Sequence, residues 1–174
     1  QDIVSASAVK ANRDYCVVPR ELKTNEVYDI MDDFINALKL AIKAGFDGVE
    51  MHGANTYLLQ QFFSPNSNQR EDEFGGNVMQ RLTVPLTLVK RAQEVRKEYN
   101  LPNFIIGYRF SPEELENPGI TLDDTMILVD HLTEAKVDYL HVSLGHYAQK
   151  SLRDKAETLT VISRLNDIVK NRVP

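Results

Sequence analysis

The sequence of 174 residues lacks tryptophan, an excess of basic residues and any cysteine other than Cys16. A single cysteine cannot form an internal disulfide, so the sequence favours a reducing, cytoplasmic compartment. With 20 basic and 25 acidic residues the net charge is −5, which argues against a nucleic-acid-binding protein. A run of about 18 apolar residues is also missing, so no membrane partner is expected.

What the sequence does contain is typical of a globular domain. Hydrophobic residues make up 43% and charged residues 26%, which gives enough apolar surface for a core. The first residues show no basic segment followed by an apolar one, so no secretory signal is recognisable. Glycine-rich phosphate motifs of the Walker or dinucleotide type are absent, because Gly75-Gly76 is too short to count as one.

Helical and extended patterns alternate along the chain. Apolar residues three and four positions apart predict helices, and short apolar runs that end in polar residues predict strands. The expected helices cover residues 25–44, 53–63, 79–99, 122–135 and 158–171, and the expected strands cover 46–52, 104–110 and 137–143. Thr24 is the expected N-cap of the first helix, and Pro85 should mark a first turn or a kink. This alternation predicts an α/β fold with parallel strands.

Polar side chains stand where the three expected strands end. His52, Arg109 and Ser143 occupy these positions. In a parallel α/β fold the carboxyl ends of the strands form the edge at which ligands bind. The sequence therefore predicts a site at this edge.

The densest group of reactive side chains is His52, Asn55 and Tyr57. The first turn of the helix expected after His52 would bring Asn55 close to it, and both side chains can donate to one oxygen atom. Such donors would stabilise an enolate-like charge, and the phenol of Tyr57 could protonate a carbon. The residue types alone fit a structural role equally well, because a histidine at a strand end is often only a hydrogen-bonding partner.

Two further interpretations concern charged residues on the strands. Arg109 needs an anionic or electron-rich partner, and a salt bridge to Glu50 is the simpler choice from the residues alone. Glu50, His52 and His141 could instead hold a metal ion in a barrel hydrolase or lyase. Their spacing is weak support, because no cysteine or carboxylate cluster completes a ligand set.

Taken together, several motifs resemble the old yellow enzyme family of FMN-dependent oxidoreductases. The similarity runs through residues 44–55 (AGFDGVEMHGAN) and 57–65 (YLLQQFFSP). It continues through residues 67–76 and Arg81, and returns in residues 107–112 (GYRFSP). Phe74 stands where the family usually has tyrosine, which touches none of the proposed hydrogen-bond donors.

The resemblance implies a (β/α)8 TIM barrel that binds FMN at the carboxyl edge of its strands. NADH or NADPH would reduce the flavin, which would then pass hydride to an activated alkene such as an α,β-unsaturated carbonyl compound. By resemblance, His52 and Asn55 hold the substrate carbonyl oxygen and Tyr57 protonates the α-carbon. Arg109 would lie beside the pyrimidine end of the flavin, where a cation favours the anionic reduced ring.

The resemblance also implies that residues 1–174 are the central portion of one FMN-binding barrel domain. The family's early strands and the last two strands, whose loops bind the FMN phosphate, have no counterpart here, and three strands cannot close an eight-stranded barrel. Arg70 and Arg81 are expected to brace the long polar loop. A small-molecule substrate is the expected partner, a homo-oligomer remains open, and a non-enzymatic α/β module is the remaining alternative.

Overall fold

The computed structural model describes residues 2–170 and 172–174. Its elements follow in the order β1 (Val4–Ser5), β2 (Arg20–Glu21), α1 (Thr24–Lys43), β3 (Gly48–Gly53), α2 (Leu58–Phe63), α3 (Val78–Arg81), α4 (Thr83–Glu98), β4 (Ile105–Phe110), α5 (Leu122–Glu134), β5 (Tyr139–Val142) and α6 (Val161–Val169). Within the described ranges, no helix is both long and apolar enough to cross a membrane.

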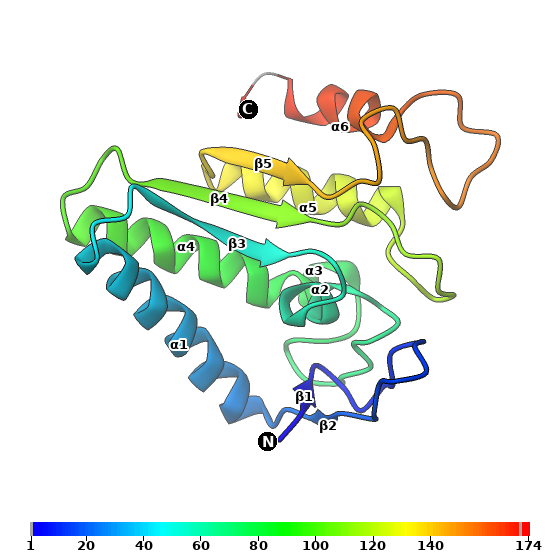
Figure 1. The fold of residues 1–174 in the computed structure, drawn as a ribbon, viewed down its shortest axis with the longest axis horizontal. Helices are drawn as coiled ribbons and strands as arrows, with labels where there is room; N and C mark the ends of the chain where they lie inside the picture. The colour runs from blue at the N-terminus through cyan, green and yellow to red at the C-terminus, as the bar shows by residue number, and fades with distance from the viewer. Residues whose placement is uncertain (1, 171) are drawn as a thin grey trace.

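The main sheet has three parallel strands in the order β3-β4-β5 (Figure 1). The register places His52 opposite Arg109, and Arg109 opposite His141. Because the three strands run in the same direction, their carboxyl ends lie at one edge of the sheet. The predicted α/β fold with about three parallel strands is confirmed.

One face of the main sheet is covered by helices, with α4 and α5 lying behind the strands in Figure 1. Side chains alternate along a strand, so Ile106, Tyr108 and Phe110 of β4 are all buried on this helical face. They join Leu88 of α4 and Leu128 of α5 in the hydrophobic core. Packing in the core therefore determines which side chains of each strand point toward the opposite face of the sheet.

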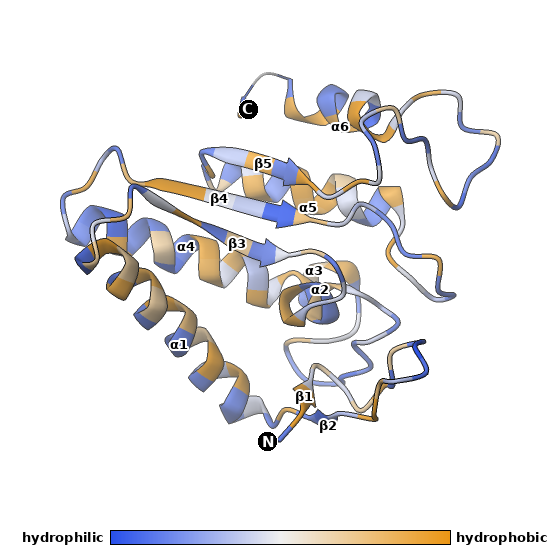
Figure 2. Ribbon diagram, in the orientation of Figure 1, coloured by the Kyte–Doolittle hydropathy of each residue, from blue (hydrophilic) through white to orange (hydrophobic). Residues whose placement is uncertain are grey.

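The opposite face of the main sheet, here called the open face, is polar. It carries Glu50 of β3, Arg109 of β4, and Tyr139 and His141 of β5, which contact one another. No helix from the described part of the chain lies over it in Figure 1. Figure 2 shows β4 changing from hydrophobic to hydrophilic toward its carboxyl end. The open face is thus where chemistry-bearing side chains gather.

A second, smaller sheet near the N-terminus escapes prediction from the sequence. In it β1 and β2 pair in parallel, with Val4 opposite Arg20 and Ser5 opposite Glu21. Each strand has two residues, which is too short for an alternating pattern to stand out. After this sheet, α1 packs against α4 and β3.

The start of α1 and the start of β3 differ from the expected boundaries. The prediction of Thr24 as N-cap is wrong, because Thr24 is already helical and Lys23 takes the cap position. The Glu26 carboxylate accepts the Lys23 N–H at 2.7 Å, which closes the first turn one residue earlier. The strand begins at Gly48 rather than at residue 46, since Gly45 turns the chain at φ 84° and Phe46 stays 66% exposed.

The second helix begins later than expected, at Leu58 instead of residue 53. Asn55 and Thr56 have φ angles of 57° and 64°, which a right-handed helix cannot include. The helix expected over residues 79–99 is divided at Leu82 into α3 and α4. Pro85 lies in the first turn of α4, where its missing N–H breaks no helical hydrogen bond.

Helix α5 begins at residue 122, as expected. Its first turn is closed by a capping box, in which the Thr121 side chain accepts the Asp124 N–H and the Asp124 carboxylate accepts the Thr121 N–H. The final helix is shorter than the expected range of residues 158–171. It begins after the cap residue Thr160 and ends at Val169, and Asn171 lies outside the described residues.

Two buried arginines brace the long loop between α2 and α3, as expected. The Arg70 side chain is 3% exposed, donates to the carbonyls of Ala6 at 2.9 Å and Leu22 at 2.5 Å, and pairs with Asp72. Arg81 donates to the carbonyls of Phe63 at 2.8 Å and Gly76 at 2.7 Å. These bonds tie the loop to the N-terminal segment and to the end of α2.

Candidate functional site

His52 lies near the carboxyl end of β3 in a position to donate one hydrogen bond. Its Nδ1 atom accepts a long hydrogen bond of 3.4 Å from the Ala54 N–H. An accepting Nδ1 carries no proton, so the proton of a neutral ring lies on Nε2. The arrangement leaves the Nε2–H of His52 as a donor for a ligand oxygen.

The surroundings of His52 favour its neutral form. Partial burial is the largest cause that lowers the pKa of His52 below its usual value, and the charge of Arg109 acts in the same direction. The Glu50 carboxylate opposes this shift of the His52 pKa, without reversing it. His52 is therefore a neutral donor at pH 7, as a group that polarises a carbonyl should be.

Asn55 follows β3 and is held by the ends of the two neighbouring strands. Its N–H donates to Ser111 Oγ at 2.9 Å, and its Oδ1 accepts from Ser143 Oγ at 3.0 Å. The prediction that a helical turn brings Asn55 beside His52 is wrong, because Asn55 lies in a left-handed turn ahead of α2. With Oδ1 engaged, the Nδ2 group is the free donor of the amide.

The sequence predicts that Ser143 lies at a strand end, but it does not predict that Ser143 binds Asn55. Ser111 likewise follows directly after β4. The Ser143 hydroxyl donates to Asn55 Oδ1, whereas the Ser111 oxygen accepts from the Asn55 N–H. They position the amide, which is a role that spacing along the chain does not reveal.

Tyr57 is the N-cap residue of α2 and remains 61% exposed. Its ring meets the His52 ring edge-on, with ring centroids 5.1 Å apart and an interplanar angle of 64°. The structure therefore brings Tyr57 and His52 together at the carboxyl edge. An exposed phenol beside a neutral imidazole can deliver a proton to a ligand bound there.

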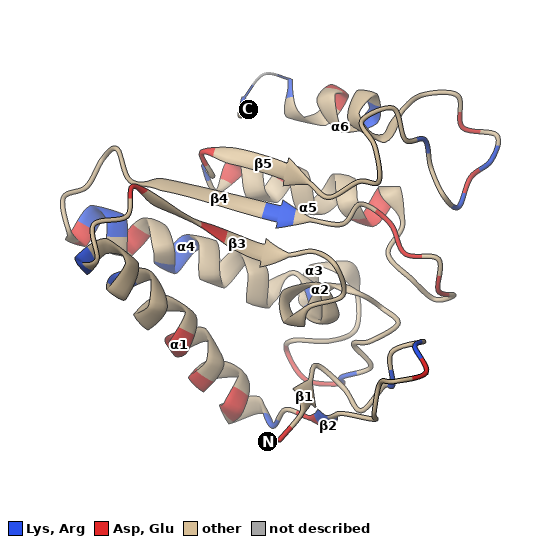
Figure 3. Ribbon diagram, viewed as in Figure 1, with Lys and Arg blue, Asp and Glu red and all other residues tan. Residues whose placement is uncertain are grey.

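Arg109 pairs with Glu50, which is the partner that the residues alone favoured. Arg109 Nε lies 2.6 Å from Glu50 Oε1, and Figure 3 shows this basic position on β4 beside the acidic one on β3. Glu50 Oε2 lies 2.9 Å from both the Tyr139 hydroxyl and His141 Nδ1. Tyr139 had no predicted role, because only the pairing of β4 with β5 places it over β3.

The metal-site alternative does not find its ligand set in this geometry. The Glu50 carboxylate is engaged by a guanidinium and two further donors, as described above. His52 Nδ1 accepts from the backbone N–H of Ala54. In the described part of the chain, no three histidine, cysteine or acidic residues are grouped as metal ligands.

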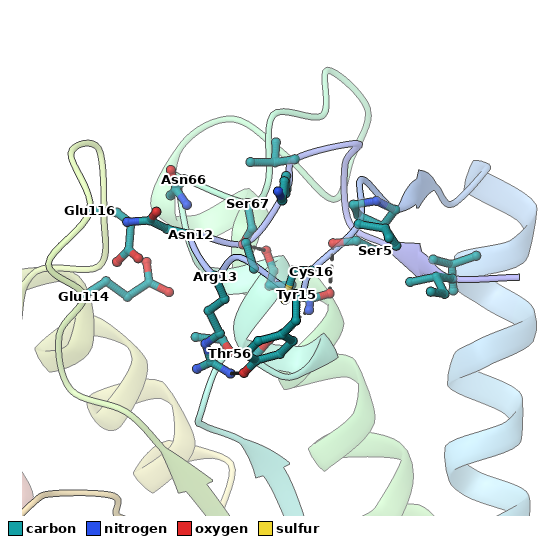
Figure 4. A pocket seen from close by; sticks show the side chains of 18 residues that line it. Ser5, Asn12, Arg13, Tyr15, Cys16, Thr56, Asn66, Ser67, Glu114 and Glu116 are labelled. Carbon is teal, nitrogen blue, oxygen red and sulfur yellow. Dashed lines mark hydrogen bonds between the residues drawn. The ribbon is translucent and has the colours of Figure 1, made fainter.

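A cavity of about 400 Å³ adjoins this site without containing it. It lies between the N-terminal segment and the loop residues around Thr56, Asn66 and Glu114 (Figure 4). In Figure 4 the side chains of Arg13 and Tyr15 point toward Thr56. The cavity therefore borders the turn that carries Asn55 and Tyr57.

Comparison with known proteins agrees with the geometry. Residues 1–173 match the description of the NADH:flavin oxidoreductase / NADH oxidase family. The chain is 49% identical over 149 residues to "NADH:acrylate oxidoreductase" of Vibrio harveyi, covering 86% of this chain and 15% of that protein. It is 45% identical over 174 residues to "Probable NADH-dependent flavin oxidoreductase YqiG" of Bacillus subtilis, covering all of this chain and 46% of that protein.

The fold is shared with morphinone reductase, whose solved structure superimposes with a TM-score of 0.78 at 25% identity. The match covers 99% of this chain and 48% of that one, so the chain spans about half the length of this neighbour. The resemblance to the old yellow enzyme family is thereby confirmed, together with its α/β architecture. The chain belongs to the NADH:flavin oxidoreductase / NADH oxidase family.

Proposed function

We propose that the protein containing this chain is an FMN-dependent oxidoreductase that takes electrons from NADH and reduces an activated alkene. The observation that carries the proposal is the meeting of two neutral donors, a phenol and a cation at one sheet edge. His52 and Asn55 supply the donors, Tyr57 the phenol and Arg109 the cation. This set suits a carbonyl compound whose oxygen gains charge during reaction.

The relatives support the choice of electron donor. The two matched proteins named above both carry NADH in their names, although one is named for acrylate and the other for flavin. NADPH remains a second donor to be tested. Acrylate is itself an activated alkene, which supports the proposed substrate class. The chain covers only 15% of that relative, so the support is for the class rather than for acrylate.

The roles of the chain's residues follow from their geometry. The His52 Nε2–H and the Asn55 Nδ2 group donate to the substrate carbonyl oxygen, which draws electron density away from the β-carbon. When bound, FMN supplies the hydride. Tyr57 then gives its phenolic proton to the α-carbon, and the 5.1 Å separation of its ring from the His52 ring keeps proton donor and carbonyl donor together.

Arg109 fits the cofactor by the chemistry of its donors. Its Nε–H donates to His141 Nδ1 and its Nε forms an ion pair with Glu50, and neither terminal amino group has a hydrogen bond to any residue that the structure describes. A partly exposed guanidinium with free amino groups is suited to the electron-rich oxygen and nitrogen atoms of a flavin ring. Arg109 is thus the residue of this chain that would hold FMN.

The test uses the complete protein that contains this chain, purified and kept free of oxygen. Its visible spectrum and the cofactor released on denaturation should identify FMN. NADH should be consumed only when an enone or acrylate is added, and NADPH is compared at the same concentration. A colourless protein would overturn the flavin assignment. NADH consumption that no alkene stimulates would overturn the alkene acceptor.

A further inference from the structure

We propose that Glu50 is a positioning residue, which holds Arg109 through an ion pair at Nε and so keeps both terminal amino groups of the guanidinium available to the flavin. The inference rests on the proposed function, because it concerns how this arginine is presented to FMN. In this role Glu50 contacts neither the flavin ring nor the substrate. It acts only through Arg109.

The first support is the arrangement of contacts around the Glu50 carboxylate. One oxygen takes Arg109 Nε at 2.6 Å, and the other takes the Tyr139 hydroxyl and His141 Nδ1, each at 2.9 Å. Arg109 Nε also lies 3.2 Å from His141 Nδ1. Two residues of β5 therefore hold the carboxylate in place, and the carboxylate in turn holds Arg109 of β4.

The second support is that the sheet makes room for this arrangement at Gly107. The register places Gly107 between Glu50 of β3 and Tyr139 of β5. A Cβ atom added to Gly107 would lie 2.1 Å from Cζ of the Tyr139 ring. The ring of Tyr139 thus crosses β4 directly over the glycine, and this is how its hydroxyl reaches Glu50.

The third support is the charge state of the carboxylate. Burial, the largest single influence, acts to raise the pKa of Glu50, yet hydrogen bonds from His141 and Tyr139 and the charges of His141 and Arg109 lower that pKa overall. The Glu50 side chain is 20% exposed and that of Arg109 is 34% exposed. Glu50 is therefore an anion at neutral pH, and it forms an ion pair with the guanidinium.

The direction in which the FMN midpoint potential changes when Glu50 is replaced separates a positioning role from a direct effect of the Glu50 charge. A flavin ring gains negative charge when it is reduced, so a fixed anion nearby disfavours reduction and a fixed cation favours it. If Glu50 acted only by its own charge, removing it would raise the midpoint potential. If Glu50 positions Arg109, removing it releases the cation and lowers the midpoint potential.

The experiment measures the FMN midpoint potential and the FMN dissociation constant in the complete protein. Glu50→Leu removes charge and acceptor at similar volume. We expect the affinity for reduced relative to oxidised FMN to fall about tenfold, the scale of one charge-assisted hydrogen bond. A tenfold fall is about 30 mV for a two-electron couple. Glu50→Gln keeps an acceptor oxygen and should restore part of the loss.

Two further variants keep the test decisive if Glu50→Leu fails to fold. Tyr139→Phe leaves the carboxylate but removes one of its anchors, and should lower the potential by a smaller amount. In an Arg109→Ala background, Glu50→Gln should no longer lower the potential. Glu98→Gln, at an exposed position on α4, is the matched control and should leave the FMN midpoint potential and dissociation constant unchanged.

The outcomes distinguish this proposal from the proposed function. An unchanged or raised potential in the Glu50 variants would overturn the positioning role. The same holds if the effect of Glu50→Gln persists after Arg109 is removed. A wild-type protein that binds no FMN would instead overturn the proposed function itself.

Discussion

The amide of Asn55 illustrates how much of this site depends on single residues outside the recognisable motif. Its backbone is bound by Ser111 and its side-chain oxygen by Ser143, so residues from two other strand ends determine which way it faces. The amide group that remains free is the donor. At this scale, the chemistry of a residue is set by the neighbours that occupy its other hydrogen-bonding atoms.

Tyr57 gives the first prediction at the scale of a residue. In the complete protein, Tyr57→Phe should leave the reduction of the flavin by NADH unchanged. It should slow the reduction of the alkene by about 10²- to 10⁴-fold, the usual contribution of a general acid. Rapid-mixing measurements of the two half-reactions separate these effects.

Tyr147→Phe is the matched control, because Tyr147 is 88% exposed and lies beyond β5. It should leave both half-reactions unchanged. If Tyr57→Phe slowed both half-reactions equally, Tyr57 would not be the proton donor. A defect confined to flavin reduction would contradict the assignment in the same way.

The residues at the ends of the strands could be predicted from the sequence, but their contacts could not. His52 and Arg109 end apolar runs, and parallel strands bring such ends to one edge. The left-handed turn at Asn55 and Thr56 could not be predicted, because it depends on the two serines that accept and donate there. The link from Tyr139 to Glu50 joins residues 89 positions apart in sequence.

At the scale of elements, long helices were the most predictable features and short strands the least. The apolar stripe of α1 spans 20 residues, which is enough for its period to stand out. By contrast, β1 and β2 have two residues each. Arg70 binds the carbonyls of Ala6 and Leu22, the residues that follow these two strands. This contact links residues far apart in the sequence, so the pairing of the two strands could not be predicted from a local pattern.

Arg70 therefore gives a prediction at the scale of elements. Arg70→Ala would leave Asp72 and two buried carbonyl groups without their cation, and should lower the free energy of unfolding of the complete protein by about 3–5 kcal/mol. Loop residues 64–77 should also be cleaved sooner in limited proteolysis. Chemical denaturation followed by circular dichroism measures the first effect, and mass spectrometry of the fragments measures the second.

Arg91→Ala is the matched control for this experiment, because Arg91 forms an exposed ion pair with Asp32. It should change the free energy of unfolding by at most about 1 kcal/mol. Equal destabilisation by the two substitutions would show that Arg70 is no more important than a surface arginine. Unchanged proteolysis in Arg70→Ala would show that the arginine does not brace the loop.

At the scale of the whole molecule, the main sheet presents an uncovered face and two outer strands. In the described part of the chain, β3 and β5 each pair with β4 alone within this sheet. Ile105 on the open face is 43% exposed, and Phe46 beside β3 is 66% exposed. Unpaired backbone and exposed apolar side chains of this kind favour association with another chain.

We therefore expect the isolated 174-residue chain to self-associate. Size-exclusion chromatography with light scattering should show a mass that rises with concentration, starting from the 19.8 kDa of one chain. The complete protein, measured at the same concentrations, is the control and should keep a constant mass. An isolated chain that stays monomeric throughout would show that these surfaces do not drive association.

The crossing of Tyr139 over Gly107 has an evolutionary consequence. Any side chain introduced at position 107 must displace the aromatic ring, and any smaller residue at position 139 removes the reason for a glycine. Position 107 should therefore tolerate change only when position 139 changes as well. Among natural variants, a residue other than glycine at 107 should accompany a small residue at 139, and His141 should then be the remaining anchor of Glu50 from β5.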